Sequence, residues 1–206
     1  MTFPDEKFET VTGFAEAYVE NLKAAHGSVD GEKLEAACKL LAAAYGRGAS
    51  VYACGNGGSA SISNHLACDH SKGAQTDTDL RPKVVSLATN MEMITAIAND
   101  ISYDEIFVYQ LRTLAEPGDV LLTISSSGDS ENVVRAAQWA KDNGLDVISF
   151  TGFEGGRTAG LAKVNLHVEG DNYGVIEDTH QGLMHILAQY IRLARMDEET
   201  VRKRKF

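Results

Sequence analysis

The 206-residue sequence has few cysteines, no long apolar run and no excess of positive charge. Its three cysteines, Cys38, Cys54 and Cys68, form an odd set without metal-type spacing, which favours reduced thiols over a disulfide framework. No stretch approaches the roughly 18 consecutive apolar residues of a membrane helix. The acidic N-terminal segment lacks the apolar core of a secretion signal. We therefore expect a cytoplasmic protein that spans no membrane.

The acidic net charge argues against nucleic acid as a partner. The formal net charge is -10, whereas a nucleic-acid-binding domain is normally basic. The basic run at 202–205 is typical of a solvated chain end. The length and the 44% of hydrophobic residues are typical of one globular domain with a buried core. We expect a single domain over 1–206, with a helical segment (1–48), an α/β core (49–196) and a basic tail (197–206).

Apolar residues recur with two periodicities along the chain. Residues 5–25 and 34–45 carry them at helical spacing, and we expect two helices there. Beyond residue 49, short apolar runs alternate with helix-like segments, the pattern of a parallel sheet covered on both faces. The expected strands are 50–55, 83–88, 119–125, 145–152 and 164–169, and the expected helices lie around 90–98, 103–115, 131–143 and 175–196. Ligands of such sheets bind beyond the carboxyl ends of the strands.

The third expected strand runs into a serine-rich turn. Ser125, Ser126, Ser127 and Ser130 lie between this strand and an amphipathic helix. A helix start offers unpaired N–H groups and the positive end of the helix dipole, which together bind anions. Helix capping by Asp129 or Ser130 would explain one hydroxyl but not the three serines before it. The turn predicts a phosphate site, better suited to a sugar phosphate than to a nucleotide held with magnesium.

A glycine-rich turn, CGNGGSAS, follows the first expected strand. Gly55, Gly57 and Ala60 nearly match a dinucleotide fingerprint, but the acidic residues about twenty positions on, Asp77 and Asp79, lie in a polar, loop-like segment. The lysine of a nucleotide-hydrolysing phosphate loop is also missing. We therefore expect this turn to help bind a sugar phosphate, and we expect no nucleotide cofactor.

Two groups of polar residues with helical spacing could bind a metal or take part in catalysis. His65 and Asp69 are four residues apart and share one face of the helix that follows the glycine turn. Glu177, Gln181 and His185 are spaced i, i+4, i+8 on a later helix. The two groups could bind one transition metal, or divide acid and base roles across a substrate. Spacing alone leaves both possibilities open.

The other histidines lack such a pattern. We expect His26 and His70 at the surface and His167 within a strand. His180 falls nearer the side of the helix that carries His185. None of these four is expected to have a catalytic role.

The motifs CGNGGSAS, AIAND, PGDVLLTISSSGDSENV and IEDTHQGLMHIL, in this order, closely resemble the sugar isomerase (SIS) domain proteins. The resemblance runs from about residue 10 to 195 and is greatest to the phosphoheptose isomerases. It implies a five-stranded parallel sheet flanked by helices, and a homotetramer that uses the N-terminal helices in assembly. It also implies conversion of sedoheptulose 7-phosphate to a D-glycero-D-manno-heptose 7-phosphate through an enediol. The alternative is a non-catalytic SIS protein that senses sugar phosphates or binds the replication initiator.

The same resemblance implies roles for individual residues. The sugar phosphate would be bound by Asn56, Gly57, Gly58, Ser59, Asn99, Asp100, Ser125, Ser126, Ser127, Ser130 and Glu177. One zinc or similar divalent ion per subunit would be held by His65, Asp69, Glu177 and His185. Asp69 stands where the family has a glutamate, and Glu177 where it has a glutamine. Asp69 and His185 would carry the proton transfers, in an order that the resemblance leaves unassigned.

Overall fold

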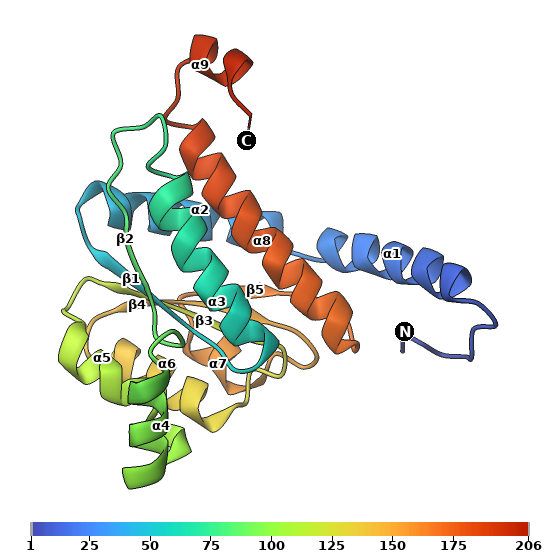
Figure 1. The fold of residues 1–206 in the computed structure, drawn as a ribbon, viewed down its shortest axis with the longest axis horizontal. Helices are drawn as coiled ribbons and strands as arrows, with labels where there is room; N and C mark the ends of the chain where they lie inside the picture. The colour runs from blue at the N-terminus through green and yellow to red at the C-terminus, as the bar shows by residue number, and fades with distance from the viewer. Residues whose placement is uncertain (1, 206) are drawn as a thin grey trace.

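The computed structural model describes residues 2–205 around one sheet of five parallel strands (Figure 1). The strands are β1 (Ser50–Cys54), β2 (Lys83–Ser86), β3 (Val120–Ser125), β4 (Asp146–Thr151) and β5 (Val164–His167). Their order is β2-β1-β3-β4-β5, and each neighbouring pair is parallel. The chain moves outward in opposite directions from β1 and β3. The carboxyl ends of these two strands therefore form the switch point at which such sheets bind ligands.

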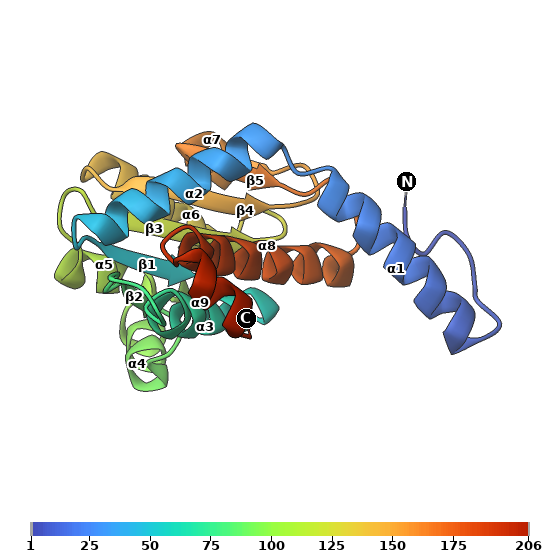
Figure 2. The ribbon, with the colours of Figure 1, turned by 90° about the horizontal axis from the view of Figure 1, so that it is seen from above.

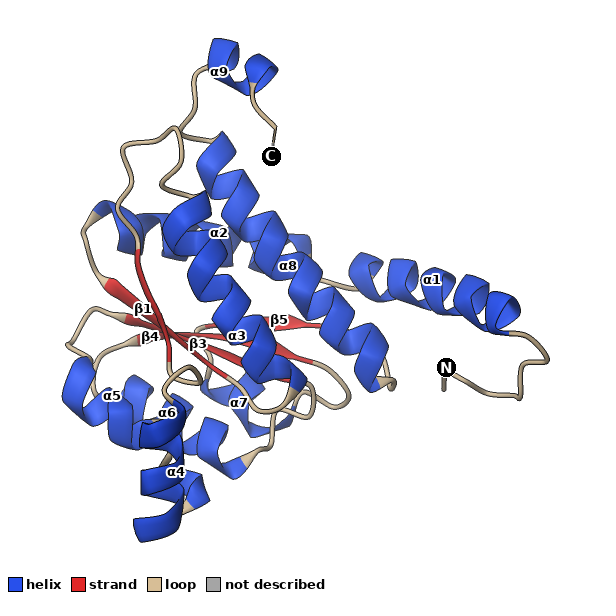
Figure 3. Cartoon of the chain, viewed as in Figure 1, coloured by secondary structure: helices blue, strands red, loops and turns tan. Residues whose placement is uncertain are grey.

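Two sets of helices cover the two faces of the sheet (Figure 3). One apolar core contains residues of α2 (Gly31–Gly46), α3 (Gly58–Cys68) and α8 (Tyr173–Leu193). The other contains residues of α4 (Met91–Asp100), α5 (Val108–Leu114) and α6 (Glu131–Asp142). The shorter elements are η1 (Asp69–Gly73), η2 (Tyr103–Glu105), α7 (Gly156–Leu161) and α9 (Glu198–Lys203). Within the described residues, no helix has the length and apolar character needed to cross a membrane.

The central strand β3 shows why the sequences of the strands are almost entirely apolar. Successive side chains of a strand point to opposite faces of the sheet. Val120, Leu122 and Ile124 enter the core with α2, α3 and α8, whereas Leu121 enters the core with α4, α5 and α6. Because both faces are covered, every residue of this strand is buried.

The N-terminal helix α1 (Val11–Gly27) projects from the body of the molecule and is joined to it through α8 (Figures 1 and 2). It was expected to begin near residue 5, but it begins at Val11 because the Thr10 hydroxyl accepts a hydrogen bond from Gly13 N at 3.1 Å. Tyr18 donates a 2.6 Å hydrogen bond to Asp178 of α8. Much of the projecting helix is exposed, and Val11 retains 81% of its accessible surface.

The expected strands are confirmed, with ends that differ by at most two residues. The helices expected around 90–98, 131–143 and 175–196 are confirmed as α4, α6 and α8, whereas the segment 103–115 divides into η2 and α5. The π-helical turn η1 and the short helices α7 and α9 were not predicted. Elements of five or six residues carry too few apolar repeats for their period to be recognised.

Candidate active site

The serine turn and the glycine turn face each other across a cavity of about 240 Å³ at the carboxyl ends of β1 and β3. The lining residues are Asn56, Gly57, Gly58, Ser59, Ile124, Ser125, Ser126, Ser127, Ser130, Tyr173 and Glu177. All of them except Ile124 and Tyr173 were expected from the sequence to bind a sugar phosphate. The fold therefore brings together two turns that lie about seventy residues apart, where a doubly wound sheet places its ligand.

The serine turn has hydroxyls with two different functions. Ser125 Oγ accepts a hydrogen bond from Gly128 N at 3.1 Å, and Ser127 Oγ accepts one from Asp129 N at 3.3 Å, so these two shape the turn. Ser130 occupies the N-cap position of α6, yet its side chain makes no capping bond. Ser126 is 5% exposed and its Oγ has no hydrogen-bond partner. Capping does not account for these two hydroxyls.

The orphaned Ser126 hydroxyl indicates a missing partner. A buried polar group without a partner costs about 1–3 kcal/mol, and folded proteins rarely retain one without a reason. Ser126 is one of the residues that line the cavity, and Ser130, at the start of α6, is another. An anion in the cavity would accept from the hydroxyl and lie at the positive end of the helix dipole.

The glycine turn places the start of α3 on the other side of the cavity. Gly57 is the N-cap of α3 with φ of 54°, a left-handed conformation that glycine adopts readily. A Cβ at Gly55 would lie 2.6 Å from the carbonyl oxygen of Ile124, so only glycine allows the turn to pack against β3. A Cβ at Gly58 would collide with the Glu177 carboxylate, which occupies that space. Burial, and then the charge of Asp178, raise the pKa of Glu177.

His65, Asp69 and His185 form a second cluster, which we call the His/Asp/His cluster. His65 Nε2 is 3.4 Å from Asp69 Oδ1, and His185 Nε2 is 3.4 Å from Asp69 Oδ2. The two imidazole rings are edge to face, with centroids 4.9 Å apart. One ligand atom from each residue lies within 4.8 Å of the others. The cluster brings two imidazoles and a carboxylate to one point.

The helices α3 and α8 bring this cluster together because they lie side by side and run in the same direction (Figure 1). Glu177 of α8 meets Gly58, at the start of α3, and His185 meets Asp69, just beyond its end. The cavity and the His/Asp/His cluster therefore lie at opposite ends of the line of contact between α3 and α8, which we call the seam. Asp69 begins the π-helical turn η1, a kind of turn found frequently at functional sites.

The structure does not bring every predicted site residue together. Glu177 lines the cavity and is not a member of the His/Asp/His cluster. Asn99 and Asp100 lie at the end of α4, exposed and hydrogen-bonded to each other at 2.7 Å, and neither lines the cavity described above. Their predicted role in binding the sugar phosphate remains a prediction.

Besides Ile124 and Tyr173, sequence reasoning missed three residues that contact the predicted site residues. The Gln181 amide lies 2.9 Å from His65 Nδ1; the sequence analysis noted its spacing without giving it a role. Tyr103 donates to Asn56 Oδ1 at 2.9 Å, and buried Asn132 exchanges two hydrogen bonds with the same amide. The i+4 spacing could have identified Gln181. The contacts of Tyr103 and Asn132 depend on tertiary packing, which no local pattern reports.

His70 was expected at the surface, and that expectation was wrong. The side chain is fully buried in the π-helical turn, 2.7 Å from the Tyr45 hydroxyl through Nδ1 and 3.3 Å from the Met184 carbonyl oxygen through Nε2. Burial lowers the pKa of His70 to about 4. His180 is also fully buried, and burial lowers its pKa to about 4 as well. Both histidines are neutral core residues at physiological pH.

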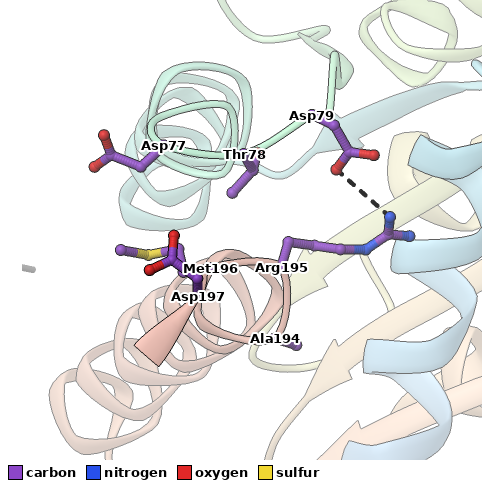
Figure 4. A pocket seen from close by; sticks show the side chains of 7 residues that line it. All are labelled: Asp77, Thr78, Asp79, Ala194, Arg195, Met196 and Asp197. Carbon is purple, nitrogen blue, oxygen red and sulfur yellow. Dashed lines mark ion pairs between the residues drawn. The ribbon is translucent and has the colours of Figure 1, made fainter. Parts of the chain in front are cut away.

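A larger and more open hollow of about 810 Å³ lies at the C-terminal end of α8 (Figure 4). Figure 4 shows Asp79 facing Arg195, and these two side chains form an ion pair of 3.5 Å. The carboxylates of Asp77 and Asp197 also line the hollow. Like charges repel, so these carboxylates make the hollow a poorer site for a phosphate than the smaller cavity between the two turns.

The family model that matches this chain is the SIS domain, over residues 13–152. A phosphoheptose isomerase from Alteromonas mediterranea is 38% identical over 163 residues, which are 78% of this chain and 82% of that protein. A probable phosphoheptose isomerase from Thermoplasma acidophilum is 35% identical over 178 residues, which are 86% of this chain and 97% of that protein. The chain belongs to the SIS domain family and, within it, to the phosphoheptose isomerase group.

Solved structures agree with this assignment. The phosphoheptose isomerase from Neisseria gonorrhoeae superposes with a TM-score of 0.79 at 32% identity, covering 87% of this chain and 97% of that chain. The phosphoheptose isomerase from Francisella tularensis superposes with a TM-score of 0.81 at 27% identity, covering 89% of this chain and 96% of that chain. The expected fold class, a five-stranded parallel sheet flanked by helices, is confirmed.

Proposed function

We propose that the protein is an aldose–ketose isomerase that converts sedoheptulose 7-phosphate to a D-glycero-D-manno-heptose 7-phosphate. The observation that carries the proposal is the cavity with its unpartnered Ser126 hydroxyl, which lies at one end of a seam whose other end holds the His/Asp/His cluster. A phosphate site and groups able to move protons are the two requirements of this reaction. The relatives named phosphoheptose isomerase support the choice of substrate.

The phosphate would be bound first, and it would fix the sugar. Ser126 and Ser130 donate hydroxyl hydrogens to it, and the starts of α3 and α6 supply backbone N–H groups. Such contacts involve no chemistry, but they hold the rest of the substrate along the seam. Holding a substrate in its reactive geometry removes much of the entropic part of the barrier.

The proton transfer would take place at the His/Asp/His cluster. Isomerisation moves a proton between C1 and C2 of the sugar through an enediol, so it needs a base, an acid and stabilisation of charge at two oxygens. Asp69 and His185 face each other at 3.4 Å and are partly exposed, so both can reach a substrate and exchange protons. A non-catalytic SIS protein has no need of this cluster, which favours an enzyme.

The cluster has the right chemistry to hold a divalent transition metal. Two imidazole nitrogens and a carboxylate oxygen within 4.8 Å of one another are ligands that zinc accepts, and a fourth position is left for substrate or water. We propose His65, Asp69 and His185 as the residues that hold it. A bound zinc would polarise the carbonyl of the substrate.

Assembly and location complete the proposal. We infer a homotetramer, because apolar side chains such as Val11 and Val19 of α1 and Met91 of α4 are 81%, 58% and 64% exposed. A cytoplasmic location agrees with the three free cysteines. The direct test of the function is to incubate the protein with sedoheptulose 7-phosphate and follow the sugar by NMR. Formation of an aldoheptose phosphate is expected, and its absence with and without added zinc would overturn the proposal.

A further inference from the structure

Two side-chain amides join the glycine turn to the start of α6. Asn56 Nδ2 donates to Asn132 Oδ1 at 2.8 Å, and Asn132 Nδ2 donates back to Asn56 Oδ1 at 3.0 Å. Asn132 is 2% exposed, whereas Asn56 lines the cavity between the two turns. A planar amide that is held at both its oxygen and its nitrogen cannot rotate without losing both hydrogen bonds. Asn132 therefore fixes the orientation of an amide in the wall of the cavity.

A backbone group determines which end of each amide is the oxygen. Val133 N donates to Asn132 Oδ1 at 2.9 Å and shares its hydrogen with the Ser130 carbonyl oxygen at 3.0 Å. Because a backbone N–H can only donate, the atom of Asn132 that it meets is the oxygen. The NH₂ group of Asn132 is then left to donate to Asn56 Oδ1. The orientation of the Asn56 amide thus follows from the backbone of α6.

Tyr103 of η2 adds a third hydrogen bond to this pair. Its hydroxyl donates to Asn56 Oδ1 at 2.9 Å, although the residue is 54% exposed. A carbonyl oxygen has two lone pairs, and those of Asn56 accept from Tyr103 and Asn132. The Asn56 nitrogen carries two hydrogens, and one of them goes to Asn132. Within residues 2–205, these partners leave Asn56 one side-chain N–H to offer to a ligand.

We propose that Asn132 and Tyr103 are positioning residues, which hold the Asn56 amide so that it offers a bound sugar phosphate an N–H and not a carbonyl oxygen. Phosphate oxygens accept hydrogen bonds, so an N–H attracts them, whereas a reversed amide would present an oxygen that repels them. The N–H adds a neutral donor to the Ser126 hydroxyl and the helix starts. The inference deepens the proposed function and rests on it, because it takes this cavity as the phosphate site.

The test measures the binding of inorganic phosphate to the full-length protein, from the rise in melting temperature with phosphate concentration at constant ionic strength. Each protein is compared with its own phosphate-free melting temperature, so a change in intrinsic stability is accounted for. The variants are Asn132→Leu, Tyr103→Phe and Asn56→Ala. The matched controls are Gln138→Leu, at an exposed position of α6, and Tyr109→Phe, at an exposed tyrosine of α5, and neither residue lines the cavity.

We expect Asn132→Leu and Asn56→Ala each to weaken phosphate binding about 10-fold, the loss typical of one hydrogen bond to a charged group. Tyr103→Phe keeps the amide pair and should weaken binding about 3-fold, and both controls should bind phosphate as the wild type does. In the Asn56→Ala background, neither Asn132→Leu nor Tyr103→Phe should weaken binding further, because residues that act through one partner are not additive. A general distortion of the turn would weaken binding in both backgrounds.

Unchanged phosphate binding in Asn132→Leu or in Tyr103→Phe would overturn the inference. A further loss of binding in the Asn56→Ala background, or no phosphate binding by the wild type, would overturn it as well. Where Asn132→Leu does not fold, the exposed Tyr103→Phe substitution in the two backgrounds decides alone. The wild-type isomerase assay is run separately, so a protein that binds phosphate with this pattern but isomerises no heptose phosphate counts against the proposed function alone.

Discussion

Among the described residues, Ser126, Thr158 and His180 each have a buried side-chain polar atom without a hydrogen-bond partner, and of these three only Ser126 lines the cavity. Its hydroxyl is buried without a partner, while the neighbouring hydroxyls of Ser125 and Ser127 accept backbone hydrogen bonds. A group of this kind destabilises the free protein and is compensated when a ligand binds. Serines that are close together in the sequence thus have different energetic roles, and burial and hydrogen bonding distinguish them.

The double substitution Ser126→Ala and Ser130→Ala should weaken sugar-phosphate binding and leave the fold intact. Each hydrogen bond to a charged partner is worth about 1.5–3 kcal/mol. Calorimetric titration with sedoheptulose 7-phosphate measures the loss. Ser61→Ala, at an exposed position of α3, is the matched control and should bind normally. Unchanged affinity in the double variant would remove the phosphate assignment.

Ser126→Ala alone should also have an effect that requires no ligand. It removes a buried hydroxyl that has no partner, so the free energy of unfolding of the free protein should stay the same or rise. Chemical denaturation of the two proteins in phosphate-free buffer measures the difference. A clear loss of stability would mean that the hydroxyl has a partner within the protein.

Asp69 is the carboxylate of the His/Asp/His cluster, and Asp69→Asn keeps its size while removing its charge and basicity. General acid–base catalysis contributes about 10²–10⁴-fold to a rate, so isomerase turnover should fall by about that factor. Asp69→Glu carries the residue type of the resembled family and should retain activity. Steady-state kinetics of both variants tests the assignment, and an active Asp69→Asn enzyme would contradict it.

At the scale of elements, Arg157 of α7 holds the serine turn in place. Its backbone N and Nε donate to Asp129 Oδ1 at 3.1 and 2.9 Å, and its Nη2 donates to the Asp129 carbonyl oxygen at 2.8 Å. These bonds hold the pKa of Asp129 below its usual value. Asp129 belongs to the turn that carries Ser126 and Ser130, the two serines proposed to bind the phosphate. A short helix that the sequence did not predict thereby fixes the geometry of the cavity.

Arg157→Ala should therefore weaken sugar-phosphate binding severalfold without abolishing it. The arginine is exposed, so its ion pairs add little to global stability, but their loss allows the turn to move. Arg202→Ala, which removes a similar exposed pair on α9, is the matched control. Calorimetry on the two variants separates a local effect on the turn from a general effect of charge. Equal affinities in the two variants would show that the turn holds its shape without Arg157.

At the scale of the whole molecule, sequence reasoning located most of the fold and much of the candidate site. The strands and the two polar turns were predictable because burial on both faces, helix starts and glycine turns leave local patterns. The burial of His70 was not predictable, because its environment is made by Tyr45 and Met184, which are distant in sequence. The separation of Glu177 from the His/Asp/His cluster depends on how α3 and α8 lie side by side, and spacing along one helix cannot report that.

The two buried histidines make the stability of the whole fold sensitive to acid. Burial lowers the pKa of His70 and of His180 from 6.5 to about 4. The unfolded chain therefore binds protons at a higher pH than the folded chain, and stability is lost as the pH falls from about 6.5 towards 4. Each group contributes about 3 kcal/mol to this loss.

Urea denaturation between pH 7 and pH 4 measures this loss, and His180→Gln should make the dependence shallower. The comparison is between slopes, so a lower stability of the variant at neutral pH does not disturb it. A wild-type protein whose free energy of unfolding stays constant over this range would contradict the assignment of both histidines as neutral core residues.

Because α3 and α8 run in parallel, the distance between the cavity and the His/Asp/His cluster sets the length of substrate that can reach both. Eight residues of α8 separate Glu177, beside the cavity, from His185, and at 1.5 Å per residue this distance is about 12 Å. A sugar whose phosphate lies among the serines reaches the histidines only if its carbon chain extends along most of the seam. The proposed position of the phosphate would therefore favour substrates with a longer carbon chain. Turnover should fall from seven-carbon to six-carbon to five-carbon ketose phosphates even though each carries the same phosphate group.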